Sequence, residues 1–264
     1  MLVFASFIPH PLISIPEIGK RSNVKMRATT AALRSIMLEL YAAQPAVIVI
    51  ISPHGDAVPD TFMINQQPRM QVSFKQFGDL VDQYEIANAT GFGYRLKESA
   101  ETKLPLLVTD ETILDYGTGV VLYNVFTRIK PEALQLVSIT FNSASLENHA
   151  AVAAHLNKYI SIASQRIAVL VTGDLAHGAG RSGAIPYNPA AKKFNDAMHA
   201  VVGSGDREAL AHVIATTTPA VPECGSRSLY FLLSLLGDRV YKPDIRSYET
   251  VSGVGYMTAT FGVR

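Results

Sequence analysis

Three short apolar runs in the chain end beside histidines, and this pattern sets the strongest limit on the fold. The runs and the residues after them are Val3–Ile8 with Pro9-His10, Val47–Ser52 with Pro53-His54, and Ile167–Thr172 with Gly173-Asp174-Leu175-Ala176-His177. Uninterrupted apolar runs of this length are typical of strands buried on both faces of a parallel sheet. Since ligands of open α/β sheets bind outside the carboxyl ends of the strands, we expect the three imidazoles to meet at one place. That is the geometry of a metal site.

Strand-like and helix-like segments alternate along the chain. The clearest are strand 2–7, helix 23–43, strand 46–51, strand 134–140, helix 146–164 and strand 167–172. This rhythm predicts an α/β fold with a mostly parallel central sheet, helices on both faces and the metal site at the carboxyl ends of the strands. We find no linker, so a single domain over residues 1–264 is expected. The other expected elements are a hairpin of strands 61–64 and 70–74, a helix over 79–100, an apolar segment at 104–108, a helix from about 118 that stops before Pro131, a loop over 178–189, helices near 190–202, 206–216 and 225–236, and strands 244–249 and 254–261.

Composition narrows the classes of partner. Lys plus Arg (23) nearly balance Asp plus Glu (22), and no segment combines basic with aromatic residues, so nucleic acid is not an expected partner. No run approaches the roughly 20 apolar residues that cross a bilayer, so we expect no membrane segment. The single cysteine, Cys224, excludes an internal disulfide and fits a reducing cytoplasm. Dinucleotide, Walker, nucleophile-elbow and Cys-x-x-Cys motifs are absent from the sequence.

The histidines suggest a particular kind of metal site. Two histidines and one carboxylate on one face of the ion, with the other positions open, is the arrangement of non-haem Fe(II) oxygenases. His10 and His54 supply the nitrogens, and Glu223 is the best-placed carboxylate, because a loop turns there into the apolar helix 225–236. An acid at this position can equally be an ordinary first-turn residue stabilised by the helix dipole. Both interpretations of Glu223 stay open.

Three further residues near these positions could take part in chemistry. Asp174 precedes His177 by three residues, so its carboxylate either orients the imidazole, shares a metal with it, or caps the turn. Cys224 is either a soft metal ligand or a small core residue. The remaining histidines fall in predicted helices without a partner pattern and are interpreted as surface or packing residues: His149, His155, His199 and His212.

Short motifs in a fixed order carry a resemblance to a known family. They are Phe7-Ile8-Pro9-His10-Pro11, Ile51-Ser52-Pro53-His54-Gly55, Phe74-Lys75-Gln76-Phe77-Gly78, Leu114-Asp115-Tyr116-Gly117-Thr118 with Leu122-Tyr123, Thr172-Gly173-Asp174-Leu175-Ala176-His177, Pro222-Glu223-Cys224-Gly225, and Ser247-Tyr248-Glu249 with Gly253-Val254-Gly255-Tyr256. No single piece is very specific, but their number and order over nearly the full length are. The chain resembles the class III extradiol dioxygenase superfamily, which includes the B subunit of protocatechuate extradiol dioxygenase and the Memo-like proteins.

The resemblance implies a function and a role for each residue. His10, His54 and Glu223 would bind Fe(II), with zinc or copper as alternatives, and His177, together with Asp174, would be the acid–base group. The substrate would be a small catechol- or aminophenol-type aromatic, cleaved with O2, and relatives of this kind commonly assemble into homo-oligomers. Memo-like members have a cysteine that corresponds to Cys224, so the third ligand can move by one residue.

Two other functions stay open beside ring cleavage. Dioxygenases of the group often carry histidine where this chain has Tyr116. A Memo-like redox-metal protein is therefore an alternative, and a binding module without chemistry is another. All metal hypotheses require the ring nitrogens of His10 and His54 to lie close enough to share one ion.

Overall fold

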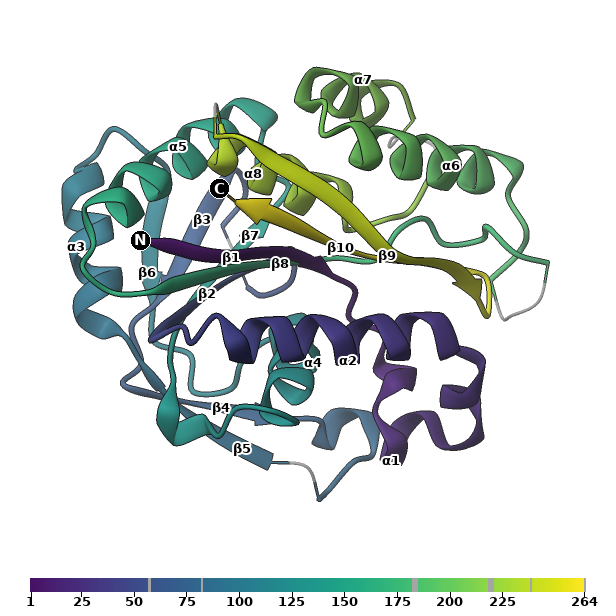
Figure 1. The fold of residues 1–264 in the computed structure, drawn as a ribbon, viewed down its shortest axis with the longest axis horizontal. Coiled ribbons are helices and arrows are strands. Elements are labelled where there is room, and N and C mark those ends of the chain that lie inside the picture. The colour runs from purple at the N-terminus through teal and green to yellow at the C-terminus, as the bar shows by residue number, and fades with distance from the viewer. Residues whose placement is uncertain (57, 82, 182–184, 218–220, 238, 264) are drawn as a thin grey trace.

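Parallel strands form the centre of the structure, as the apolar runs predict (Figure 1). The computed structural model describes residues 1–264 except 57, 82, 182–184, 218–220, 238 and 264, and except the side chains at 21–23 and 263. The strands are β1 (Leu2–Ile8), β2 (Val47–Ser52), β3 (Thr61–Asn65), β4 (Arg69–Ser73), β5 (Gln83–Asn88), β6 (Leu106–Thr109), β7 (Gln135–Asn142), β8 (Ile167–Thr172), β9 (Tyr241–Val251) and β10 (Val254–Val263).

The sheet has ten strands, in the order β4-β5-β7-β2-β8-β1-β10-β9, with β3 and β6 off this path. All neighbours from β5 to β1 are parallel, and β10 then pairs antiparallel with β1. β3 pairs antiparallel with the last residues of β7, while β5 pairs with its first residues. The carboxyl ends of β1, β2 and β8 therefore lie side by side at one edge.

Helices cover both faces of the sheet. They are α1 (Pro16–Gly19), α2 (Arg27–Ala42), α3 (Thr90–Ala100), α4 (Tyr116–Phe126), α5 (Leu146–Ile162), α6 (Pro189–Ser204), α7 (Arg207–Thr217) and α8 (Ser226–Leu236), with short 3₁₀ turns at Leu12–Ser14, Lys20–Lys25, Lys75–Phe77 and Pro131–Ala133. α2 and α4 pack on one face, and α5 and α8 pack on the other (Figure 1). The five apolar residues of β2 are buried on both faces of the sheet. Val47, Val49 and Ile51 belong to the core under α5 and α8, whereas Ile48 and Ile50 belong to the core under α2 and α4.

The predicted α/β fold with a mostly parallel sheet is thus confirmed, but two local predictions are wrong. The expected hairpin of 61–64 with 70–74 does not form, because β3 pairs with β6 and β7 while β4 pairs with β5. The expected helix over 79–100 begins only at Thr90, and its first part is β5. In β5 the buried Ile86 and Asn88 alternate with more exposed residues, which is the two-residue period of a strand. Of the expected loop over 178–189, residues 182–184 lie outside the described residues.

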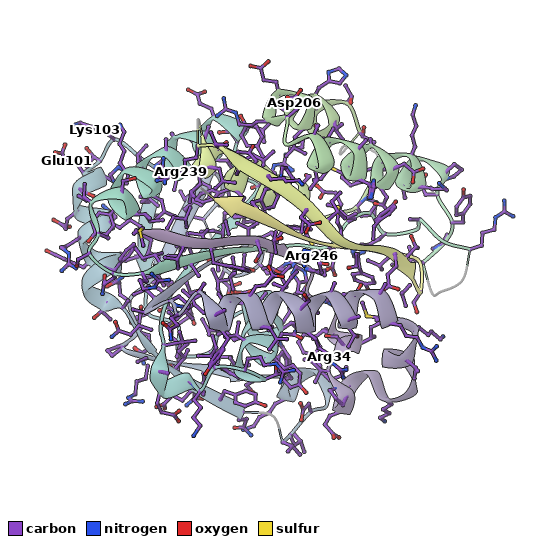
Figure 2. The ribbon with its side chains drawn as sticks, viewed as in Figure 1. Arg34, Glu101, Lys103, Asp206, Arg239 and Arg246 are labelled. Atoms are coloured by element: carbon purple, nitrogen blue, oxygen red, sulfur yellow. The ribbon has the colours of Figure 1, made fainter. Side chains whose placement is uncertain are left out.

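Charged side chains lie mainly on the outside of the molecule (Figure 2). Arg246 of β9 links two elements there, because its Nη2 lies 2.8 Å from Oε1 of Glu39 on α2. Glu101 and Lys103, after α3, form an exposed pair at 3.0 Å. In the described part of the chain, no helix combines the length and the apolar character needed to cross a bilayer.

Candidate metal centre

The ends of β1 and β2 bring His10 and His54 together. The Nε2 atoms of the two rings are 3.1 Å apart. Two nitrogens that bind one ion at about 2.0–2.1 Å can be no more than about 4.2 Å apart, so this separation allows a shared ion. His10 is 1% exposed, whereas His54 is only partly buried and also lines a cavity. One side of the pair is therefore enclosed and the other is open.

Cys224 completes the cluster. Its Sγ lies 3.5 Å from Nε2 of His10, and ligand atoms of His10, His54 and Cys224 all lie within 4.8 Å of one another. The thiol is held against the end of β8, where the backbone N–H of Asp174 donates to Sγ at 3.2 Å. Two glycines permit this approach, because a Cβ on Gly173 would lie 2.3 Å from Cα of Gly225.

Glu223, the carboxylate predicted from the sequence as the third ligand, lies outside this cluster. Its Oε2 accepts from the backbone N–H of Ser226 at 2.8 Å and its Oε1 accepts from the hydroxyl of Ser226 at 2.6 Å. These are the contacts of an acid that satisfies the first turn of a helix, here α8. Glu223 thus bonds to the first turn of α8, while Cys224 lies with the two histidines.

A hydroxyl group fixes the tautomer of His10. Thr172 donates its only hydroxyl proton to the carbonyl of Ile8 at 2.7 Å, so it accepts at 2.9 Å from Nδ1 of His10. Nδ1 therefore carries the proton, and Nε2 presents a lone pair toward His54 and Cys224. Metal-binding histidines usually donate their other ring N–H in this way. This role of Thr172 is not predicted from its position in the sequence.

Both histidines are uncharged at neutral pH. Burial, with a smaller contribution from the charge of His177, lowers the pKa of His10 to about 3. Burial also lowers the pKa of His54 to about 3, assisted by the charges of His10 and His177. Neutral imidazole is the form that binds metals. The donor set of two neutral nitrogens and one sulfur thus fits a transition-metal ion.

Thr172 gives a direct test of this arrangement. Thr172→Val keeps the shape of the side chain but removes the group that orients His10, and we expect metal affinity to fall about 10–100-fold. Thr172→Ser keeps the hydroxyl and should stay within a few-fold of the unmodified protein. Competition against a chromogenic chelator measures both. Equal affinities in the two variants would show that the hydroxyl does not orient the ring.

The pH dependence of metal binding is also expected to be distinctive. Burial, and then the neighbouring charge of Asp174, raise the pKa of the Cys224 thiol well above 9, so the thiol must release a proton to bind an ion. Affinity should therefore rise about tenfold per pH unit between about pH 7.5 and 8.5. The histidines, with pKa values of about 3, add no proton in this range. Calorimetry in buffers of different ionisation enthalpy counts the protons released when the metal binds. If the observed binding enthalpy does not depend on the ionisation enthalpy of the buffer, no proton is released and Cys224 is excluded as a ligand.

Asp174 and His177 lie on the segment after β8, and both lie close enough to act on the cluster electrostatically. Oδ1 of Asp174 accepts from the backbone N–H of His10 at 2.9 Å, and its Oδ2 lies 3.8 Å from Nε2 of His10. Burial raises the pKa of Asp174 to about 7, against the opposing effects of this hydrogen bond and of the charge of His177. His177 is partly exposed, and its backbone N–H donates to the carbonyl of Pro222 at 2.9 Å. A proton on His177 therefore influences the pKa values of His10, His54 and Asp174 together.

Tyr116, at the start of α4, forms the open side of the cluster. Its hydroxyl lies 2.8 Å from Nε2 of His54. Burial raises the pKa of Tyr116, so the phenol keeps its proton. Asp115 caps α4 through Oδ1, which accepts from the N–H of Thr118 at 3.0 Å and from the hydroxyl of Ser52 at 2.7 Å. These bonds tie the start of α4 to the end of β2.

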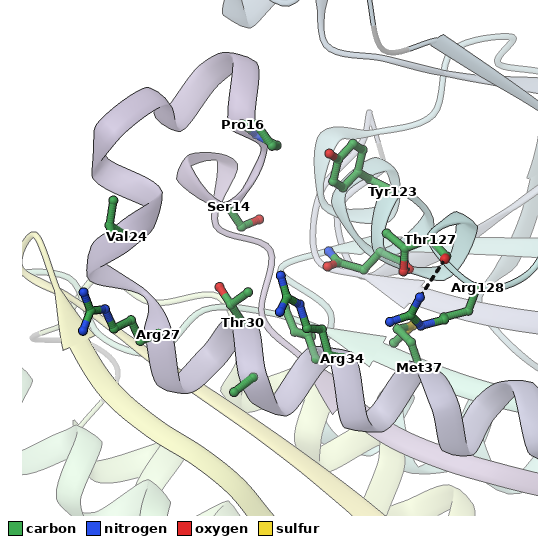
Figure 3. Close-up of a pocket in the computed structure, with 13 residues that line it drawn as sticks. Ser14, Pro16, Val24, Arg27, Thr30, Arg34, Met37, Tyr123, Thr127 and Arg128 are labelled. Atoms are coloured by element: carbon green, nitrogen blue, oxygen red, sulfur yellow. Dashed lines mark hydrogen bonds between the residues drawn. The ribbon is translucent and has the colours of Figure 1, made fainter.

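A cavity of about 440 Å³ adjoins the cluster and includes His54 and Tyr116 in its wall. Its size is in the range of small-molecule sites. A larger cavity of about 630 Å³ lies between α2 and the end of α4, where Arg34, Met37 and Tyr123 are among its lining residues (Figure 3). None of the three clustered residues lines this larger cavity. The smaller cavity is therefore the one beside the metal centre.

Comparison with known proteins agrees with this geometry. The family described as the catalytic LigB subunit of aromatic ring-opening dioxygenase matches residues 4–259. The chain belongs to the LigB family. A relative in Clostridium acetobutylicum, Protein CA_C1420, is 28% identical over 263 residues, which cover 94% of this chain and 55% of that protein. The chain thus spans about half the length of this curated relative.

A solved structure shares the fold. It is the crystal structure of the uncharacterized protein JW3007 from Escherichia coli K12, with a TM-score of 0.66 and 16% sequence identity, covering 98% of this chain and all of that chain. The LigB family accounts for the resemblance predicted from the strand-end motifs and supports a dioxygenase type of fold.

Proposed function

We propose that this LigB-family chain is a non-haem Fe(II)-dependent extradiol dioxygenase that opens the ring of a catechol- or aminophenol-type aromatic with O2. The observation that carries the proposal is the convergence of His10, His54 and Cys224 beside a 440 Å³ cavity. His10 and His54 hold the iron as neutral ligands, and we assign the third position to Cys224 rather than to Glu223. We also place the protein in the cytoplasm, where Cys224 stays reduced.

The residues around the ion have separate roles in this reaction. When bound, the ion supplies a positive charge that favours the deprotonated form of the diol and open positions for substrate and O2. His177 accepts a proton from the substrate hydroxyl and returns one to the product. The carboxylate of Asp174 accepts from the backbone N–H of His10, which holds the end of β1 in place, and its negative charge lies beside the metal ligands. Tyr116 presents a protonated hydroxyl at the open side.

One observation favours a second candidate function. Cys224, a soft ligand, occupies the place at which a carboxylate is expected in an Fe(II) oxygenase. A Memo-like protein that holds copper or zinc without cleaving a ring would use the same three residues. Metal analysis of protein purified without oxygen separates the two, because the first candidate requires iron.

Oxygen consumption tests the proposal directly. Protein loaded with iron under anaerobic conditions is mixed with a panel of catechols and aminophenols in an oxygen electrode. We expect oxygen uptake together with a coloured ring-opened product for at least one member of the panel. No uptake with any member at full iron occupancy would refute ring cleavage and favour the Memo-like alternative.

A further inference from the structure

The cavity beside the metal centre has acidic walls. Its acidic lining residues are Asp56, Glu111 and Asp115, and none of the described residues that line it is a lysine or an arginine. The whole chain is nearly balanced in charge, with 23 basic and 22 acidic residues, so this bias is local. By contrast, the larger cavity between α2 and α4 is lined by Arg27, Arg34 and Arg128 (Figure 3). The charged groups in the walls of the two cavities are therefore opposite in sign.

The backbone holds the two outer acids in place. Gly55, with a φ of 124°, turns the chain after His54 so that Asp56 lines the cavity. Nδ2 of Asn65, at the end of β3, donates to the carbonyl of Glu111 at 2.8 Å. Neither carboxylate forms an ion pair with any residue that the structure describes. Both are exposed and available to a ligand.

The third acid, Asp115, does not offer a free carboxylate to the cavity. Its Oδ1 accepts from Ser52 and Thr118, and its Oδ2 is buried away from solvent. A ligand in the cavity therefore meets the exposed carboxylates of Asp56 and Glu111. These carboxylates suit a ligand that carries hydrogen-bond donors and positive charge. A carboxylate on the ligand would instead meet like charges.

We propose that the aromatic substrate carries a cationic group, such as an ammonium-bearing side chain, which pairs with the carboxylates of Asp56 and Glu111. This inference rests on the proposed function, because it places the aromatic diol at the metal centre. Asp56 and Glu111 are then specificity-determining residues, and aromatic acids are poor substrates.

Three catechols that differ in charge away from the diol test the proposal. They are dopamine, which is cationic, 4-methylcatechol, which is neutral, and 3,4-dihydroxyphenylacetate, which is anionic. Because all three share the same diol, differences in affinity report on the rest of the cavity. Calorimetry without oxygen, on metal-free and iron-loaded protein, should show dopamine binding about tenfold more tightly than 4-methylcatechol, and the anion more weakly than both. Added salt should reduce the difference.

Variants localise the effect. Asp56→Asn with Glu111→Gln should bring dopamine within about twofold of 4-methylcatechol, whereas Glu132→Gln, an exposed acid outside the cavity, should leave the preference unchanged. Failure of dopamine to bind, equal binding of all three compounds, or a preference for the anion would overturn the proposal. Oxygen uptake is scored separately. A preference for dopamine without uptake refutes ring cleavage alone, and uptake that is fastest with the anion refutes the cationic substrate alone.

Discussion

Cys224→Ala is expected to reduce metal affinity by about 10³-fold or more, while Glu223→Gln leaves it within about threefold. The alanine removes one of the three converging ligand atoms found among the described residues, a sulfur that lies 3.5 Å from Nε2 of His10. Glu223 instead bonds to Ser226 in the first turn of α8. Glutamine keeps an acceptor there but loses the charge, so we expect a loss of about 1 kcal/mol in the free energy of unfolding.

The paired variants make this prediction decisive. Metal content after dialysis against a limiting chelator measures affinity, and thermal unfolding of the metal-free proteins measures stability. Cys224→Ala should retain less metal than Glu223→Gln. In thermal unfolding, Glu223→Gln should be the less stable of the two. If Glu223→Gln loses the metal and Cys224→Ala keeps it, the carboxylate is the ligand and α8 must begin differently when an ion is bound.

The positions of His10 and His54 could be predicted because strand order forces them together. Each follows an apolar run of the kind typical of a strand buried on both faces, and β8 has the bounds expected, Ile167–Thr172. Parallel neighbours end at the same edge, so the sequence determined which residues would meet there. No such rule applied to residues 61–88, where short half-polar strands pair with distant partners.

The third ligand could not be assigned from sequence, because adjacent residues at a helix start point in different directions. Glu223 and Cys224 are one position apart, and only the contact between Asp174 and the Cys224 sulfur decides which faces the histidines. Thr172 was also missed, although a hydroxyl at the last position of a strand that ends at the site is a usable signal. Its role depends on the register that sets β8 beside β1.

His177→Ala is expected to lower the rate of ring cleavage by about 10²–10⁴-fold and to leave iron content unchanged. The reason is that His177 lies near the cluster without belonging to it. Its charge reaches His10, His54 and Asp174, yet the group of converging ligand atoms consists of His10, His54 and Cys224. His177 is partly exposed and so is accessible to a substrate, whereas His10 is buried and burial lowers its pKa to about 3.

Two further variants distinguish this role from a general loss of structure. His54→Ala should lose the iron and therefore all activity, and His212→Ala, an exposed histidine of α7, should change neither. Imidazole added in solution should restore part of the turnover of His177→Ala, because the cavity beside His54 and Tyr116 gives a small base access to the site. Equal iron loss in His177→Ala and His54→Ala would make His177 a ligand. The proton would then have to pass through Asp174, whose pKa of about 7 makes it the remaining buried group that titrates near neutral pH beside His10.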